Sequence, residues 1–304
     1  MTQLLYGGDE MINRNWLHYV PRIVYLTCAM MFCFAAGVFG SGLVNVSALA
    51  PAAEGAGISP WSAFLPVLIF SFAIALLFAY IIIRSRWFGL KLALAIFVAF
   101  YGLMTVVMQM ESLLFLRNQM VGGILTRIFL SGLIMAGLFA PMAVIILGKV
   151  KQRELAFMFN VHLEMSLPEW LWKIVFIGCC YVVLYTAFGY FIAWKNVAVQ
   201  TYYGGQDPGS FFVHLANQWA RWPGFFLFQF GRGLLWMLFV LPIIRMHKGG
   251  KWEVGLTVAL LFAVWSVQLL IPNPLMPPDV ARVHLIETVS SNFIFGWIVG
   301  LLLA

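Results

Sequence analysis

Charged side chains are scarce in this sequence. Only 10% of its 304 residues are Asp, Glu, Lys or Arg, whereas 63% are hydrophobic. A soluble globular protein carries roughly 25% charged residues, because its surface must be hydrated. The deficit excludes a water-exposed surface over most of the chain. It predicts an integral membrane protein whose main solvent is lipid.

The familiar motifs of well-known enzyme classes are also missing. There is no Walker loop, nucleophile elbow, dinucleotide-binding fingerprint or His-Glu-x-x-His pair. All four cysteines lie inside apolar runs, where a thiol is typically a small hydrophobic side chain: Cys28, Cys33, Cys179 and Cys180. The sequence therefore assigns no catalytic class, and any cofactor stays unknown.

Eight apolar segments are long enough to cross a bilayer as helices, which takes about 20 residues. They cover residues 22–44, 60–83, 90–115, 122–148, 169–194, 223–244, 253–272 and 280–303. We expect an all-α, polytopic transmembrane bundle that forms a single domain over residues 1–304. A parallel repeat of four spans each, residues 1–150 and 166–304, is a further hypothesis, because spans three and seven end in similar polar residues.

Lysine and arginine gather in alternate connections. Arg84, Arg86 and Lys91 join spans two and three, whereas residues 45–59 and 273–279 contain no lysine or arginine. The positive-inside rule then predicts that both termini lie in the cytoplasm. The same clusters explain the net charge of +7 without a nucleic-acid partner. We expect the lipid bilayer, of the bacterial inner-membrane type, to be the main partner, and other membrane subunits remain an open alternative.

The long connection after span five contains an amphipathic stretch. One helical face carries apolar side chains and the other polar ones: Phe211, Leu215, Trp219 and Trp222 against His214, Asn217, Gln218 and Arg221. The simpler interpretation is a helix lying in the membrane interface. The alternative is a lid that covers a cavity.

Ionisable groups inside the spans are few and are therefore informative, because lipid makes them costly unless they face the protein interior. These groups and nearby amides are Arg232, Glu111, His284, Glu287, Gln229 and Gln268. Under the predicted topology, all six lie between the midplane and the outer surface. His284 and Glu287 are three residues apart and share one helical face. The pattern predicts a polar binding pocket that opens outward.

Two interpretations of these residues stay open. Arg232 should pair with Glu111 or Glu287, since an unpaired buried arginine is costly. Such a pair either serves a functional pocket or only locks helices together. His284, Glu287 and Glu111 have the donor types of a divalent-metal site, but one His-x-x-Glu pair is weak evidence. We expect no metal.

The leading functional hypothesis is a transporter or permease-like protein for a small polar or anionic solute. In it, Arg232 faces the anion, and Glu111, His284 and Glu287 gate the pocket or couple it to protons. One alternative is a membrane-embedded enzyme acting on a lipid-linked substrate at the outer leaflet, with Glu111 or Glu287 as general base and His284 as its partner. Another is a non-catalytic subunit of a membrane complex.

Overall fold

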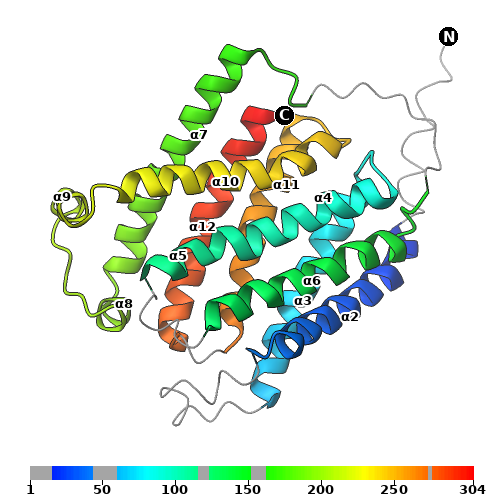
Figure 1. Cartoon of the computed structure of the whole chain (residues 1–304), viewed down its shortest axis with the longest axis horizontal. Helices are drawn as coiled ribbons and strands as arrows, with labels where there is room; N and C mark the ends of the chain where they lie inside the picture. Colours follow the sequence, from blue (N-terminus) through cyan, green and yellow to red (C-terminus); the bar gives the residue numbers. More distant parts are fainter. Residues whose placement is uncertain (1–15, 44–59, 116–122, 152–161, 273–275) are drawn as a thin grey trace.

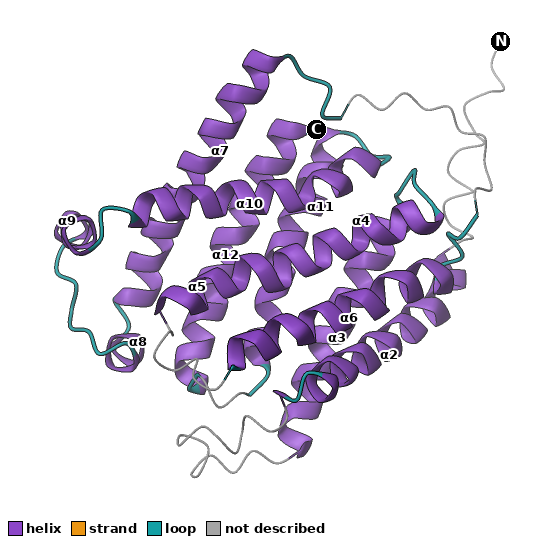
Figure 2. Ribbon diagram, viewed as in Figure 1, coloured by secondary structure: helices purple, strands orange, loops and turns teal. Residues whose placement is uncertain are grey.

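The structure, a computed structural model, is built of helices. It describes residues 16–43, 60–115, 123–151, 162–272 and 276–304. Outside the helices, the described residues contain a single isolated β-bridge, between Ser85 and His247. Figures 1 and 2 show long helices packed side by side, as the all-α prediction requires.

Eight helical segments are long and apolar enough to cross a membrane, which confirms the predicted spans to within a few residues. They run over Tyr19–Gly40, Ala63–Ile83, Gly89–Leu113, Ile124–Ile146, Leu167–Trp194, Phe225–Met246, Lys251–Leu270 and Pro278–Leu303. The corresponding α-helices are α2 (Trp16–Gly40), α3 (Pro60–Ile83), α4 (Gly89–Tyr101) with α5 (Met108–Phe115), α6 (Ile124–Ile146), α7 (Leu167–Phe188), α10 (Phe225–Met246), α11 (Lys251–Val264) and α12 (Pro278–Leu303). The protein is therefore a polytopic integral membrane protein in contact with lipid.

The connections rich in lysine and arginine meet at one end of the bundle, which we call the basic end. The Gly89 N–H donates to Lys149 O at 2.8 Å, and Lys248 N–H donates to Arg84 O at 2.9 Å. Arg22, in the first span, donates to Leu147 O at 3.1 Å. The predicted alternation of charge thus corresponds to a real clustering in space. Which side of the membrane this end faces remains a prediction.

Three spans depart from α-helical geometry near the opposite end. Span three contains a π-helical turn, η3 (Gly102–Val107), and span five ends in another, η4 (Gly189–Trp194). Span seven ends in a 3₁₀ segment, η5 (Trp265–Leu270). Such interruptions are often found at functional sites, because they redirect side chains and free backbone groups.

Glycine allows close helix contact where α7 crosses α10. A β-carbon at Gly233 would lie 2.5 Å from Cβ of Tyr181, whereas one at Gly231 would meet nothing within 4 Å. The two helices can therefore approach only because position 233 has no side chain, as is common in membrane bundles.

The amphipathic stretch after span five forms α9 (Phe211–Arg221), preceded by the short α8 (Val197–Tyr202). The predicted division of its faces is partly wrong. His214 and Gln218 are half-buried and border a small hollow beside α7, whereas Trp219 is exposed. His214 packs on the rings of Tyr190 and Trp194, so the polar residue faces the protein. The Trp219 side chain is exposed on the outer face of α9, as expected for a helix that lies in the membrane interface.

The predicted orientation can be tested with reporter fusions. A fusion after Lys248, at the basic end, should report a cytoplasmic location, and one within residues 204–209 should report the outer side. An outer signal after Lys248 would contradict the orientation.

The close crossing of α7 and α10 predicts a sharp difference between two glycines. Gly233→Ala should force the helices apart and lower the free energy of unfolding by about 1–3 kcal/mol, the usual cost of overpacking. Gly231→Ala, the matched control, should be neutral or stabilising by up to about 1 kcal/mol through helix propensity. Thermal melting in detergent measures both. Equal effects would mean that this contact does not limit the packing.

Candidate functional site

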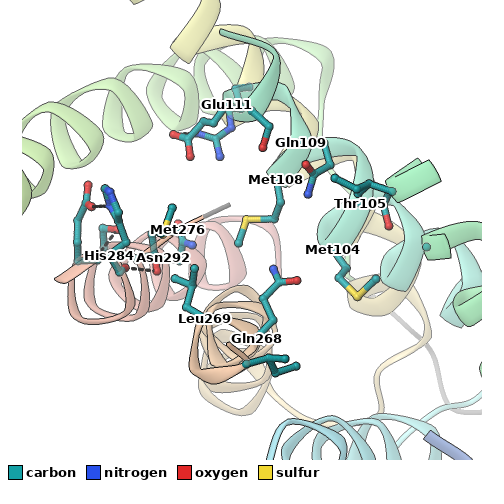
Figure 3. Close-up of a pocket in the computed structure, with 18 of the residues that line it drawn as sticks. Met104, Thr105, Met108, Gln109, Glu111, Gln268, Leu269, Met276, His284 and Asn292 are labelled. Atoms are coloured by element: carbon teal, nitrogen blue, oxygen red, sulfur yellow. Dashed lines mark hydrogen bonds and ion pairs between the residues drawn. The ribbon is translucent and has the colours of Figure 1, made fainter. Parts of the chain in front are cut away.

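A cavity of about 440 Å³ lies in the half of the bundle away from the basic end. Five of the six predicted polar-site residues line it: Glu111, Arg232, Gln268, His284 and Glu287. It extends to Leu43, Ile271 and Met276 at the end opposite the basic end. Figure 3 shows Glu111 on α5, Gln268 on η5, and His284 and Asn292 on α12 around a common space.

Arg232 and Glu111 form the predicted ion pair. The guanidinium Nη1 donates to Glu111 Oε1, and Nε donates to the carbonyl of Val107 at 3.1 Å. The Arg232 side chain is only 3% exposed, whereas that of Glu111 is 30% exposed. Arginine therefore lies in the cavity wall with its charge already compensated, and the carboxylate forms the more accessible side of the pair.

Two tyrosines complete the surroundings of Arg232. The guanidinium carbon lies 5.7 Å from the ring centroid of Tyr181 and 5.9 Å from that of Tyr185, both on α7. A cation near an aromatic face is stabilised by the ring quadrupole, most strongly away from water. Spans three, five and six thus meet at a single arginine.

His284 and Glu287 form a second polar unit on α12. His284 Nδ1 lies 2.7 Å from Glu287 Oε2, and its Nε2 lies 3.3 Å from the hydroxyl of Tyr203. Burial raises the pKa of the Tyr203 phenol, so this hydroxyl keeps its proton. With a neutral imidazole, Nδ1–H donates to the carboxylate and Nε2 accepts from the phenol. Ile286, in contrast, is 60% exposed on the outer face of the same helix.

The two predicted glutamines have different positions. Gln268, in η5, lines the cavity, but Gln229 does not. Gln229 is fully buried in α10, and neither atom of its amide has a hydrogen-bond partner among the described residues. It lies one turn before Arg232, on the outer side of the ion pair. Gln229 is therefore not among the residues that line the cavity, and its role in binding stays a prediction.

An aromatic layer closes the cavity toward the basic end. In three spans, a buried aromatic residue lies one helical turn closer to the basic end than a residue that lines the cavity. These pairs are Phe100 and Met104, Phe139 and Met135, and Trp265 and Leu269. Phe100 packs edge-on against Trp265, with 4.9 Å between ring centroids, and at a tilt against Phe139, with 5.4 Å between centroids. We call Phe78, Phe100, Phe139 and Trp265 the aromatic floor.

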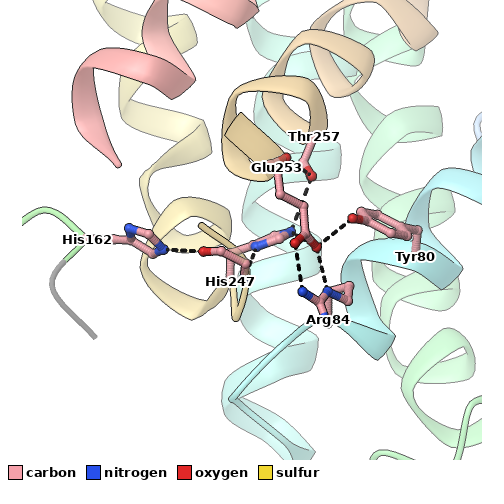
Figure 4. A network of polar contacts seen from close by, with 7 residues as sticks. Tyr80, Arg84, His162, His247, Glu253 and Thr257 are labelled. Atoms are coloured by element: carbon pink, nitrogen blue, oxygen red, sulfur yellow. Dashed lines mark hydrogen bonds and ion pairs between the residues drawn. The ribbon is translucent and has the colours of Figure 1, made fainter. Parts of the chain in front are cut away.

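Beyond the floor, a second polar network joins α3, α10 and α11 at the basic end (Figure 4). Arg84 donates to both carboxylate oxygens of Glu253 at 2.5 and 2.7 Å, and the Tyr80 hydroxyl donates to Glu253 Oε1 at 2.6 Å. We call Tyr80, Arg84, His247, Glu253 and Thr257 the basic-end latch. It is bidentate and therefore geometrically specific.

His247 belongs to the latch as a neutral side chain. Its Nδ1 accepts from the Gly249 N–H at 2.9 Å, and its Nε2 lies 3.2 Å from the hydroxyl of Thr257, which itself donates to the Glu253 carbonyl. Burial lowers the pKa of His247 to about 4. Both observations fit the Nε2–H tautomer, so the latch is uncharged at this position near pH 7.

Two contacts in these polar networks were not predicted from the sequence, that of Tyr203 with His284 and that of Arg84 with Glu253. Tyr203 lies in the connection after α8, outside the spans, and nothing in its neighbourhood indicates that it reaches His284. Arg84 and Glu253 were visible only as charges near helix ends, where either would ordinarily be hydrated. No three His, Cys, Asp or Glu side chains among the described residues come together as metal ligands.

Removing the buried cation should be costly. Arg232→Ala leaves the Glu111 carboxylate without its counter-ion and should lower the free energy of unfolding by about 3 kcal/mol, the scale for breaking a buried pair. Arg221→Ala, at the exposed end of α9, should change it by less than about 0.5 kcal/mol. Thermal denaturation in detergent provides the comparison.

A double variant identifies the source of that cost. Arg232→Leu combined with Glu111→Leu should recover part of the loss, because no charge is then left unpaired. If the double variant is less stable than Arg232→Leu alone, Glu111 stabilises the fold through contacts other than its pair with Arg232, and the unpaired carboxylate is not the source of the cost.

Comparison of the chain with protein-family models, curated proteins and solved structures found no match. The function must therefore be argued from the cavity and its two ends.

Proposed function

We propose that this protein is a permease-like transporter that binds a small polar solute in the cavity and releases it by opening the basic end. The observation that supports this proposal best is the cavity itself. It is a space of about 440 Å³ in which ionisable side chains from spans three, six and eight meet. Inside a membrane such groups are costly, and they typically mark a solute or ion pathway.

The state of Arg232 bears on the kind of solute. Glu111 already accepts from the guanidinium, and the Val107 carbonyl accepts from its Nε. An anionic solute, the other half of the sequence-based hypothesis, would have to replace the Glu111 carboxylate. A polar solute without negative charge leaves the pair intact, so we favour it.

The aromatic floor and the basic-end latch are the two barriers on the inner side of the cavity. In alternating access, a carrier opens these two inner barriers only while the outer end of the cavity is closed. The latch joins α3, α10 and α11 through side chains that can separate without breaking any helix. This arrangement favours a rocking movement of packed spans over a fixed channel.

A membrane-embedded enzyme is the second candidate, and one observation favours it. Glu287 orients His284 through Nδ1, which leaves Nε2 as the basic nitrogen beside a hydroxyl, the usual geometry of a histidine general base. Such a base could act on a lipid-linked substrate entering the cavity. A third possibility, a non-catalytic subunit, would use the same contacts only to hold its helices.

Substituted-cysteine labelling separates these functions. In a background without the four native cysteines, His284→Cys should react with an impermeant thiol reagent from the outer side. Ser266→Cys, fully buried beside the aromatic floor, should react only from the basic-end side and only when that end opens. Glu253→Gln should weaken the latch and speed the Ser266→Cys reaction several-fold.

The matched control uses an exposed ion pair at the same end. Glu164→Gln removes one carboxylate that pairs with Arg245, 3.3 Å away, and should leave the Ser266→Cys reaction unchanged. If His284→Cys reacts but Ser266→Cys is protected in every background, the cavity binds without transport, and the enzyme becomes the better proposal.

A further inference from the structure

The charges that line the cavity do not balance. Among the described lining residues they are Arg232, Glu111 and Glu287, with His284 as a titratable group. Arg232 and Glu111 neutralise each other directly. Among the described residues, the Glu287 carboxylate has only His284 as its hydrogen-bond partner. With a neutral imidazole, the described lining residues therefore carry one uncompensated negative charge.

That charge is poorly hydrated. The Glu287 side chain is only 11% exposed, and that of His284 is 18% exposed. A carboxylate away from water needs a counter-charge, because the surrounding medium screens it weakly. Two species can supply it: a proton on the imidazole, or a cation in the cavity.

The rest of the lining fits an organic cation better than a metal ion. Aromatic rings lie at the same end as Glu287, and Tyr203 stands edge-on to His284, with ring centroids 5.9 Å apart. Trp194 lies 5.7 Å from Tyr203 between centroids. Rings of this kind bind ammonium groups through their faces. The lining also includes apolar and thioether side chains, which we call the methionine-rich wall: Met104, Met108, Met135, Leu269 and Met276.

We propose that the cavity binds an organic cation, with its ammonium group beside Glu287 and its apolar body against the methionine-rich wall, and that this cation displaces a proton from the His284–Glu287 pair. The inference rests on the proposed function and gives it a substrate class and a coupling ion. Binding of the cation and protonation of the imidazole then exclude each other. A carrier built this way exchanges a cation for a proton.

Several titratable or charged groups surround the His284 imidazole and bear on its protonation. Those that line the cavity with His284, or contact it, are Tyr203 from the connection after α8, Glu287 on α12, Glu111 on α5, Arg232 on α10, and Tyr181 and Tyr185 on α7. Arg232 keeps its charge at all accessible pH values, and Glu111 is tied to it. The His284–Glu287 pair is therefore the unit in this set that can take up or release a proton.

The test uses three probes of one shape and different charge: benzylammonium, benzyl alcohol and benzoate. Each is titrated into the full chain in lipid nanodiscs by calorimetry. Benzylammonium should bind tightest. Its affinity should rise with pH by up to about tenfold per unit while the pair is protonated, the slope for one displaced proton. Calorimetry in two buffers of different ionisation enthalpy should show proton release on binding.

A matched pair of variants locates the charge. Glu287→Gln keeps the shape of the side chain and should weaken benzylammonium about tenfold or more, with loss of the pH dependence. Asp279→Asn changes an exposed carboxylate on the same helix, paired only with Arg282, and should leave binding unchanged. Gel filtration and melting verify that both variants are folded. If a variant does not fold, the three-probe titration of the native protein still tests the proposal.

Other outcomes overturn the inference in distinct ways. Equal affinity for benzylammonium and benzyl alcohol would leave a polar cavity without charge selection. Tightest binding of benzoate would make Arg232 the ligand contact. If no probe binds while Ser266→Cys labelling still depends on the latch, the organic cation is wrong and the proposed transport stands. If that labelling is also absent, both proposals fall.

Discussion

A guanidinium inside a lipid bilayer requires a counter-charge and hydrogen-bond acceptors. In this protein, the contacts that satisfy Arg232 bring three spans together. Glu111 provides the charge and the Val107 carbonyl provides an acceptor. That carbonyl belongs to the last residue of η3, where the helix leaves α geometry. Tyr181 and Tyr185 supply aromatic faces, and they can come close because residue 233 is glycine. Each feature is understandable only in relation to the arginine.

The interrupted helices have a common consequence. Segments η3, η4 and η5 all contribute to the cavity wall, through Thr105, Gly189 and Gln268 among others. Toward the basic end the same spans are regular and pack a continuous core that includes the fully buried Phe100 and Phe262. Irregular backbone at membrane depth is tolerated where it borders a cavity. The change from irregular to regular helix therefore coincides with the change from open to filled space.

Hydropathy and charge were sufficient to predict the eight spans, because lipid imposes length and composition on each helix independently of its neighbours. The pairing of Arg232 with Glu111 was also predictable, since the cost of an unpaired charge does not depend on fold. The failures have a different origin. The side of α10 on which Gln229 lies, the approach of Tyr203 to His284, and the inward turn of His214 all depend on helix rotation and loop path. A periodic pattern in one segment carries no information about either. The contact of Arg84 with Glu253 joins residues 169 positions apart, and each alone resembles an ordinary hydrated charge near a helix end.

The two polar networks differ in the way their charges are balanced, and this difference fits unequal roles. At the basic end, Glu253 is held by two bonds from Arg84 and a third from Tyr80, while burial keeps His247 neutral. That network is electrically complete without any ligand, so its natural role is to hold the helices closed. In the cavity, the Glu287 carboxylate has only the titratable imidazole of His284 as its hydrogen-bond partner among the described residues. Such a network is complete only with a proton or a bound cation. A site whose own residues leave a charge unbalanced is one that a ligand can stabilise, whereas a closed ion pair is one that a ligand must break.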